Sequence, residues 1–297
     1  MTLQQAWRRH RGLRIAALFS PLLLLLGVCM LAPLSVMLVY SFWRVENFSL
    51  VQELSLDNYA YLIDTPLYFW LIGKALFYGA IVTVVTMIVS VPVAYFMARH
   101  VGPQKGMIIT AILLPLYTSE LIRYFAWRTI LGTEGLLNSA LLRLGIITES
   151  IEMLSFSPLA VIISLSHVYL PFMILAIWVA LEALDPALLD AAMDLGARPL
   201  RMFRKIVLPL ALPGIVAGVI FVFIPVTGEF FGVNLMGGTT GFTITNAIND
   251  QFTSAFNWPL GSALSFMLLL SIGIVVAIFL VFISRLRILR NYAGREA

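Results

Sequence analysis

The chain has 297 residues, of which 61% are hydrophobic and 11% are charged, and its mean hydropathy is +0.97. A soluble domain carries roughly a quarter charged residues, so this composition excludes a soluble globular protein and indicates a multi-spanning membrane protein. The single cysteine, Cys29, excludes an intramolecular disulfide and a cysteine metal cluster. The formal net charge is +4, and its distribution along the chain is more informative than its sum.

Six apolar runs are each long enough to cross a bilayer. A spanning helix needs about 20 mostly apolar residues, because backbone groups in lipid must find their hydrogen bonds within the segment. The first run follows a basic stretch, as a signal sequence does, but it is too long for one and no small-residue cleavage site follows it. The runs cover residues 15–42, 71–98, 107–131, 158–181, 209–231 and 260–284. The sequence therefore predicts an all-α membrane protein with six transmembrane helices.

The distribution of lysine and arginine predicts which side of the membrane each connection faces. Both tails, the connection 99–106 and the connection 182–208 together contain 14 of the 19 basic residues but only five of the 15 acidic residues. Basic residues favour the cytoplasmic side, so we expect both termini and these connections in the cytoplasm. The expected organisation is a cytoplasmic tail over 1–14, a membrane domain over 15–284 and a second cytoplasmic tail over 285–297. The expected outer connections are 43–70, 132–157 and 232–259.

The polar segment 182–208 is expected to form two short helices separated by a turn. Asp185 precedes a proline and fits the N-cap of a helix over 186–195. Gly196 fits the end of that helix, where the backbone needs a positive φ angle. A second helix is expected to begin near Arg198 and to carry basic residues. The result would be a compact knob that projects from the membrane.

One side of this knob is apolar at helical spacing. Acidic residues precede the turn and basic residues follow it, which suits docking onto a soluble protein. The alternative is an amphipathic loop that lies on anionic lipid, attracted by its four basic residues. The apolar positions are Leu184, Leu188, Ala191, Ala192 and Leu195.

The segment 190–209 reads Asp-Ala-Ala-Met-Asp-Leu-Gly, then nine residues, then Ile-Val-Leu-Pro. This spacing resembles the "Glu-Ala-Ala … Gly … Ile-x-Leu-Pro" cytoplasmic loop of type I ABC importer permeases. Asp190 stands where the family usually has Glu, so its carboxylate lies one methylene closer to the backbone. Further segments resemble the polyamine (spermidine/putrescine) branch of that family. They lie at 118–119 and 123–127, at 169–173, at 222–230 and 235–238, and at 257–259, whereas Glu120 departs from the pattern.

The resemblance implies a type I ABC importer permease fold with a cytoplasmic coupling-helix loop over 182–208 that docks onto an ATPase. It implies that this chain forms half of the pathway for a polyamine in a bacterial cytoplasmic (inner) membrane. Another small organic solute, such as an amino-acid derivative or an opine, is the alternative. The residues implied in coupling to the ATPase are Asp190, Ala191, Ala192, Gly196, Arg198, Ile206, Leu208 and Pro209.

The resemblance also implies a set of partner proteins. These are a second, related permease in a heterodimer, an ATPase dimer and a periplasmic or lipid-anchored solute-binding protein. The chain has no Gly-x-x-x-x-Gly-Lys-Ser/Thr phosphate loop, so it is not the ATPase itself. We therefore expect no cofactor in this chain, with ATP and Mg²⁺ bound by the partner ATPase.

Ionisable side chains within the apolar runs are candidates for a solute pathway, because such groups are costly in lipid. Glu120 and Arg123 lie three residues apart on one helix face, so they either pair with each other or line the pathway. Glu229 lies near the outer end of the fifth run, where it either bonds a helix end or meets a cationic solute. Lys74 is expected to extend toward the interface from a helix end. With aromatic neighbours suited to cation–π contact, the candidate pathway residues are Glu120, Arg123, Tyr124, Trp127, Glu229 and Phe230.

Prolines and glycines inside the runs indicate helices that bend and pack closely. Each internal proline removes a backbone hydrogen bond and permits a kink, as at Pro115. Gly214 and Gly218 form a small-xxx-small pair that lets two helices approach closely. In the outer connection, Gly237 and Gly238 suggest a tight re-entrant turn.

Two other classes of protein explain the sequence less well. A self-contained secondary transporter would show inverted repeats with discontinuous helices, and it would leave the 190–209 pattern unexplained. An intramembrane enzyme would need a catalytic constellation, but the chain has only three histidines and no His-Glu-x-x-His.

Overall fold

The computed structural model describes residues 11–46 and 49–285, and these are mostly α-helical. Within them, five helices are long and apolar enough to cross a membrane, and a sixth crossing is made if one bent pair counts as a span. The prediction of six runs is confirmed in this sense. The long helices are α2 (Arg11–Ser41), α4 (Pro66–Arg99), α8 (Pro158–Glu182), α11 (Leu208–Thr227) and α14 (Trp258–Arg285). Most residues of the two predicted tails lie outside the described residues, and the orientation stays a prediction.

The chain divides into two compact units. The first contains the residues up to Thr65 together with Ile248–Met267. The second contains Pro66–Ala247 and the chain from Leu268 onward. Each unit has its own network of contacts, and each is described separately below.

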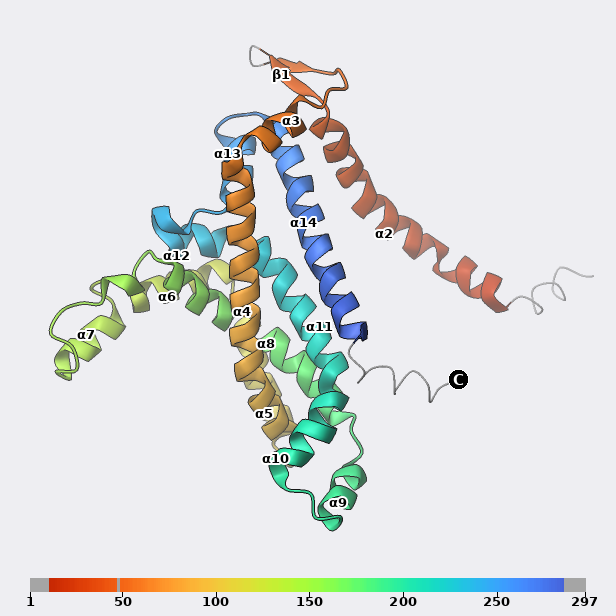
Figure 1. Cartoon of the computed structure of the whole chain (residues 1–297), viewed down its shortest axis with the longest axis vertical. Helices are drawn as coiled ribbons and strands as arrows, with labels where there is room; N and C mark the ends of the chain where they lie inside the picture. Colours follow the sequence, from red (N-terminus) through yellow and green to blue (C-terminus); the bar gives the residue numbers. More distant parts are fainter. Residues whose placement is uncertain (1–10, 47–48, 286–297) are drawn as a thin grey trace, which may run out of the picture. The chain divides into compact units, whose positions relative to one another are not determined.

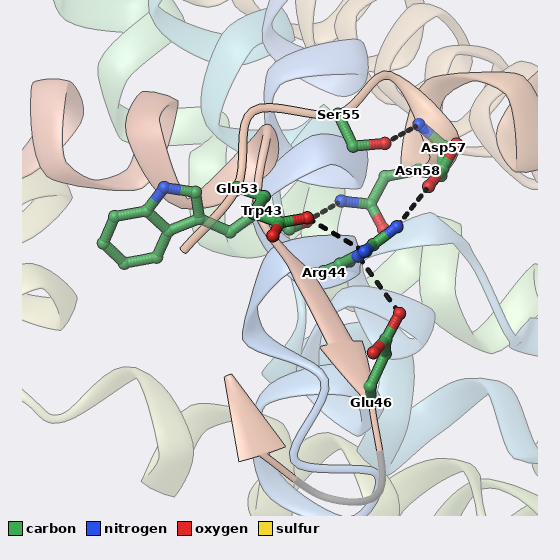
Figure 2. Close-up of polar contacts among 7 residues, drawn as sticks. All are labelled: Trp43, Arg44, Glu46, Glu53, Ser55, Asp57 and Asn58. Atoms are coloured by element: carbon green, nitrogen blue, oxygen red, sulfur yellow. Dashed lines mark hydrogen bonds and ion pairs between the residues drawn. The ribbon is translucent and has the colours of Figure 1, made fainter. Parts of the chain in front are cut away.

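The first unit contains a short β-hairpin that the sequence did not predict. Strand β1 (Arg44–Glu46) pairs antiparallel with β2 (Ser49–Val51), and helix α3 (Asp57–Asp64) follows. Figure 2 shows Arg44 at the centre of an ionic cluster beside the hairpin. Its guanidinium nitrogens lie 3.2 Å from Glu46, 2.9 Å from Glu53 and 3.8 Å from Asp57. The cluster thus links the hairpin to the start of α3.

The start of α3 is also tied to the end of α2. The Nδ2 atom of Asn58 donates to the carbonyl oxygens of Trp43 at 2.7 Å and Ser41 at 2.9 Å. The hydroxyl groups of Ser41 and Tyr59 lie 2.8 Å apart. Satisfying the last carbonyls of a helix with side-chain donors fixes the direction in which the chain leaves it.

The core of the second unit is formed by α4, α8 and α11, which pack on one another. Two glycines let α11 approach α8 closely. A Cβ atom added at Gly214 would lie 2.5 Å from the carbonyl oxygen of Ala176 and 2.5 Å from the Cβ of Ala180, and one at Gly218 would lie 2.5 Å from the sulfur of Met173. The predicted small-xxx-small contact is therefore confirmed. Buried members of this core include Tyr78, Val82, Leu165, Met173, Ile177 and Val222.

The third predicted span, over 107–131, is a bent pair of helices and not one continuous helix. Helix α5 (Lys105–Leu113) continues into the 3₁₀ turn η1 (Leu114–Tyr117), and the chain then bends by 92° before α6 (Glu120–Leu131) and α7 (Leu136–Arg143). The break has a local cause. Pro115 lacks an N–H group, and the two residues after the turn, Thr118 and Ser119, have extended backbones, so the helical hydrogen bonds stop there.

The fifth predicted span also has different limits. Helix α11 ends at Thr227, and a separate helix, α12 (Phe231–Gly241), follows and packs against α6 and α8. The expected tight turn is confirmed at Gly238, whose φ of +55° interrupts α12. A Cβ at Gly238 would lie 2.9 Å from the Cβ of Phe156, so glycine is needed both for conformation and for space. The chain also forms the turn η2 (Glu152–Leu154) and helix α13 (Ile244–Thr253), and the elements of the 182–208 loop are described below.

Candidate functional site

The first half of the 182–208 loop forms the helix that the sequence predicts. Helix α9 runs over Pro186–Asp194, one residue shorter than expected, and the Oδ1 atom of its N-cap Asp185 accepts from Ala187 N at 2.9 Å. Gly196 has a φ of +74° and donates its N–H to Met193 O at 2.8 Å. Ala197 N donates to Ala192 O at 3.0 Å, which completes a Schellman motif. The turn therefore depends on the left-handed backbone conformation at Gly196.

The expected second helix begins at Pro199, next to Arg198, as predicted, but it is not a separate helix. Helix α10 (Pro199–Met202) runs directly into a π-helical segment, η3 (Phe203–Val207), and then into α11. The second helix is thus a continuation of the fifth span. No residue with a positive φ separates the pieces, and a π segment absorbs the change of pitch without ending the helix. Figure 1 shows α9 and α10 together at one end of the α4, α8 and α11 core.

The two sides of α9 have different surroundings. Leu189 and Ala192 are buried against the core of the second unit. Leu188 is 51% exposed and Leu195 is 88% exposed. The predicted apolar face is therefore not all available to a partner, since Ala192 is already buried and Leu184 packs against the core. What remains free for a partner is the ridge formed by Leu188, Ala191 and Leu195.

The residues that the resemblance assigns to ATPase coupling are distributed around this ridge. Asp190, Ala191, Gly196, Arg198 and Leu208 are exposed, whereas Ile206 and Pro209 are half-buried. After the turn, basic side chains surround an open hollow of about 480 Å³ next to Leu200. Its basic residues are Arg198, Arg201, Arg204 and Lys205.

A second candidate site joins α6, α8 and the α11–α12 connection. The hydroxyl of Tyr124 donates to Glu120 Oε1 at 3.0 Å, and the hydroxyl of Tyr169 donates to Glu229 Oε2 at 2.9 Å. Glu120 also lies close enough to Tyr169 and to Glu229 to influence both electrostatically. Two carboxylates and two phenols thus lie together although they come from distant parts of the sequence.

Tyr169 is not among the predicted pathway residues, although it lies in the 169–173 segment that resembles the polyamine branch. A tyrosine in an otherwise apolar run needs a partner for its hydroxyl, and this was the available signal. The partner itself, Glu229, lies 60 residues away in sequence. No local pattern could have paired the two side chains.

Glu229 is 8% exposed, and both of its carboxylate oxygens have protein partners. Besides the contact with Tyr169, its Oε1 accepts from Gly232 N at 3.0 Å, within the first turn of α12. Its own carbonyl oxygen accepts from the hydroxyl of Thr245 at 2.9 Å. The expected contact of Glu229 with a helix end is confirmed, and its contact with a cationic solute stays a prediction.

Arg123 does not pair with Glu120, and that expectation was wrong. Among the described residues, no ion pair joins the two side chains, and Arg123 instead donates to Val168 O at 3.4 Å on α8. Glu120 has Tyr124, one helical turn further on, as its partner. The helix face predicts that two residues are neighbours, but the surrounding helices decide which partner each side chain meets.

Two aromatic candidates face other aromatic rings. Trp127 stands edge-on to His167 with 5.4 Å between ring centroids, and Phe230 stands edge-on to Phe231 at 5.3 Å. Phe230 is the half-buried residue that precedes α12. Both rings lie next to the residues of the polar cluster in sequence, but among the contacts of the described residues neither ring has a cation over it.

Lys74 has a structural role that the sequence did not predict. Its ammonium group donates to the carbonyl oxygens of Thr240 and Phe242 at the end of α12, and it lies 4.9 Å from the centroid of the Trp70 ring. Whether this side chain also extends toward the membrane interface stays a prediction. The Glu229 carboxylate at the first turn of α12 matches the helix dipole, and the Lys74 ammonium supplies a donor for carbonyl oxygens where the chain leaves α12.

We expect removal of the Glu229 carboxylate to destabilise the second unit. Glu229→Leu leaves the Gly232 N–H and the Tyr169 hydroxyl buried without their acceptor, which costs about 2–4 kcal/mol for the two groups. Glu229→Gln keeps one carbonyl oxygen for Gly232 N and costs less. Thermal unfolding of the purified protein in detergent measures the difference. Equal apparent Tm values for both variants and the wild type would show that these contacts do not stabilise the fold.

Residues 106–290 match the family described as "Binding-protein-dependent transport system inner membrane component". The spermidine/putrescine transport system permease protein PotB of Salmonella typhimurium is 38% identical over 240 residues, which are 80% of this chain and 83% of that protein. The inner membrane ABC transporter permease protein YdcU of Escherichia coli is 33% identical over 288 residues, which are 93% of this chain and 90% of that protein.

Solved structures share the fold at lower identity. Two crystal structures of a bacterial ABC transporter of the polysaccharide alginate contain chains that are 17% identical to this one, with TM-scores of 0.75 and 0.70. The matches cover 95% of this chain, and 99% and 97% of the matched chains. At this identity the likeness concerns the fold alone. One of these structures includes a periplasmic protein with bound alginate pentasaccharide.

Proposed function

The chain belongs to the family of inner membrane components of binding-protein-dependent transport systems, and we propose that the solute it transports is a polyamine such as spermidine or putrescine. It is a multi-pass permease subunit of an ABC importer in the inner membrane, and the predicted permease fold is confirmed. The observation that carries the solute proposal is the 38% identity to a spermidine/putrescine permease over 80% of the chain.

The polar cluster supplies chemistry that suits such a solute. Protonated amines need carboxylates and aromatic faces in a site from which bulk water is largely excluded. Glu120 is half-buried and is the carboxylate that a solute could reach, whereas Glu229 is buried and already engaged. We therefore assign the amine contact to Glu120, which Tyr124 orients, and a positioning role to Glu229. Arg123, Trp127 and Phe230 stay candidate pathway residues next to this contact.

The loop over 182–208 is proposed to dock onto the partner ATPase. The exposed ridge of Leu188, Ala191 and Leu195 gives an apolar surface for a groove, and the Gly196 turn fixes how α9 is presented. The four basic residues in this connection, together with those of both tails and of the connection 99–106, support a cytoplasmic location, with both termini on the same side. ATP and Mg²⁺ would be bound by the ATPase dimer, and its closure would move α9 and open the pathway.

Further partners complete the proposed importer. A second, related permease would form the other half of the pathway in a heterodimer. A periplasmic or lipid-anchored solute-binding protein would deliver the solute, and the alginate transporter structure with its periplasmic protein supports a partner of this kind.

ATP hydrolysis by the complete complex in proteoliposomes tests the proposed function. We expect the binding protein loaded with spermidine or putrescine to stimulate hydrolysis several-fold, and we expect uptake of the same solute to require ATP. Stimulation by an amino-acid derivative or an opine, and not by polyamines, would replace the proposed solute and keep the transporter class. Uptake by this chain without any ATPase would contradict the importer mechanism and favour a secondary transporter.

A further inference from the structure

The end of α4 is bonded to the point where α8 ends and the 182–208 loop begins. Arg99, the last residue of α4, donates from one terminal nitrogen to Leu181 O at 3.1 Å and to Leu184 O at 3.2 Å. The last carbonyls of a helix lack partners within it, and a cation at that end also matches the helix dipole. The guanidinium of Arg99 therefore holds the first residues of the loop against α4.

The start of α5 makes a second contact with the same place. The Nζ atom of Lys105 lies 2.6 Å from Glu182 Oε1 and 3.4 Å from Ala98 O. The side chains of Lys105 and Glu182 are 30% and 38% exposed, so the ion pair is partly shielded from water. Because Lys105 is the first residue of α5, this pair joins the base of the loop to α5 as well as to α4.

The other end of the loop contacts α4 too. The Tyr95 ring stands nearly perpendicular to the Phe203 ring, with 5.5 Å between centroids. Tyr95 lies one helical turn before Arg99 and therefore on the same face of α4. Phe203 is the first residue of the π segment by which the loop returns to the membrane. Both ends of the loop thus meet the last two turns of α4.

From these contacts we infer that Arg99 and Lys105 are positioning residues that transmit movement of the 182–208 loop to α4 and α5. The direction of transmission follows from connectivity. Helix α5 continues through η1 to the 92° break, directly after which Glu120 begins α6. A displacement of the loop base pulls on Lys105, which lies 15 residues before Glu120. The inference rests on the proposed function and adds to it the route from the ATPase to the polar cluster.

The competing explanation is that these side chains only cap the end of α8 and stabilise the fold. Both explanations expect a lower unfolding temperature when the contacts are removed. Only a role in transmitting movement predicts a lower ratio of solute-stimulated to basal ATP hydrolysis in complexes that assemble normally. Charge exchange tests whether the ion pair itself is required, because it restores the pair with neither original side chain in place.

The experiment uses the complete complex in proteoliposomes with spermidine-loaded binding protein. Lys105→Glu and Glu182→Lys are each expected to lower the stimulation ratio about threefold, in line with a partly exposed ion pair. The double variant, with the two charges exchanged, is expected to regain at least half of the wild-type ratio. Arg99→Met is expected to lower the ratio more, about tenfold, and Arg99→Lys to retain most of it. Arg143→Glu, which makes the same charge change on the exposed end of α7, serves as the matched control and should leave the ratio unchanged.

The outcomes distinguish failure of the inference from failure of the proposed function. If the wild-type complex shows no solute-stimulated hydrolysis with any of the solutes, the proposed function fails. The inference is overturned if the wild type is stimulated and the single variants have the same ratio of stimulated to basal hydrolysis. A lower unfolding temperature with an unchanged ratio would show that the contacts are only structural. Loss of stimulation in the charge-exchanged variant to the level of the single variants also overturns it.

Discussion

Gly196→Val is expected to lower solute-stimulated ATP hydrolysis by the complex at least tenfold. The φ angle of Gly196 is +74°, and its N–H and that of Ala197 form the Schellman motif that ends α9. A left-handed conformation costs an ordinary L-residue about 1–2 kcal/mol, and more for a β-branched side chain. A change of 1.4 kcal/mol corresponds to a factor of ten in an equilibrium. The turn then adopts another conformation, and the exposed ridge on α9 is no longer held in the orientation in which it would dock onto the ATPase.

The cause of this effect is the backbone conformation, since a Cβ atom at Gly196 meets nothing within 4 Å. Asparagine tolerates the left-handed region, so Gly196→Asn is expected to keep most of the stimulation. Gly145 offers a matched control, because its φ is +68° and the space around it is also open, but it lies in the 132–157 connection. If Gly145→Val reduces stimulation as strongly as Gly196→Val, the loss reflects general damage to the protein, and the coupling role of the turn is contradicted.

Gly214→Val is expected to prevent the protein from accumulating in a folded form. The added Cβ atom would lie 2.5 Å from the backbone oxygen of Ala176 and 2.5 Å from the Cβ of Ala180. A backbone oxygen in the middle of α8 cannot move aside as a flexible side chain can, so α11 and α8 must separate. Overpacking of this kind costs about 1–3 kcal/mol or more, and the loss of contacts along the helix pair adds to it. Gel filtration of detergent-solubilised protein and its thermal unfolding measure the effect.

Gly73→Val in α4 is the control for this prediction. A Cβ atom at Gly73 meets nothing within 4 Å, and valine has a higher helix propensity than glycine. We expect this variant to elute and unfold like the wild type. Wild-type behaviour of Gly214→Val itself would show that the close approach of α11 and α8 is not required for folding.

Several features were determined by the sequence alone because their causes are local. The apolar runs require helices, since a backbone in lipid can satisfy its hydrogen bonds only within the segment. Asp185 caps α9 and Gly196 ends it, as predicted, because an N-cap and a positive φ angle depend on the residue at that position. The small residues at Gly214 and Gly218 similarly predicted close helix packing, although not which helix would be the neighbour.

Other features were decided by the tertiary structure, because they depend on how separate helices are arranged. Hydropathy could not locate the break between η1 and α6, since the residues on both sides of it are apolar enough to continue a span. The partners of Tyr169 and Lys74 lie 60 or more residues away, and only the packing of α8 and α4 with the residues around α12 brings them together. Periodicity places Arg123 and Glu120 on one helix face, but the nearby carbonyl on α8 is what Arg123 meets. A side chain in a membrane protein bonds to whichever partner the surrounding helices bring within reach, and the local sequence does not contain that information.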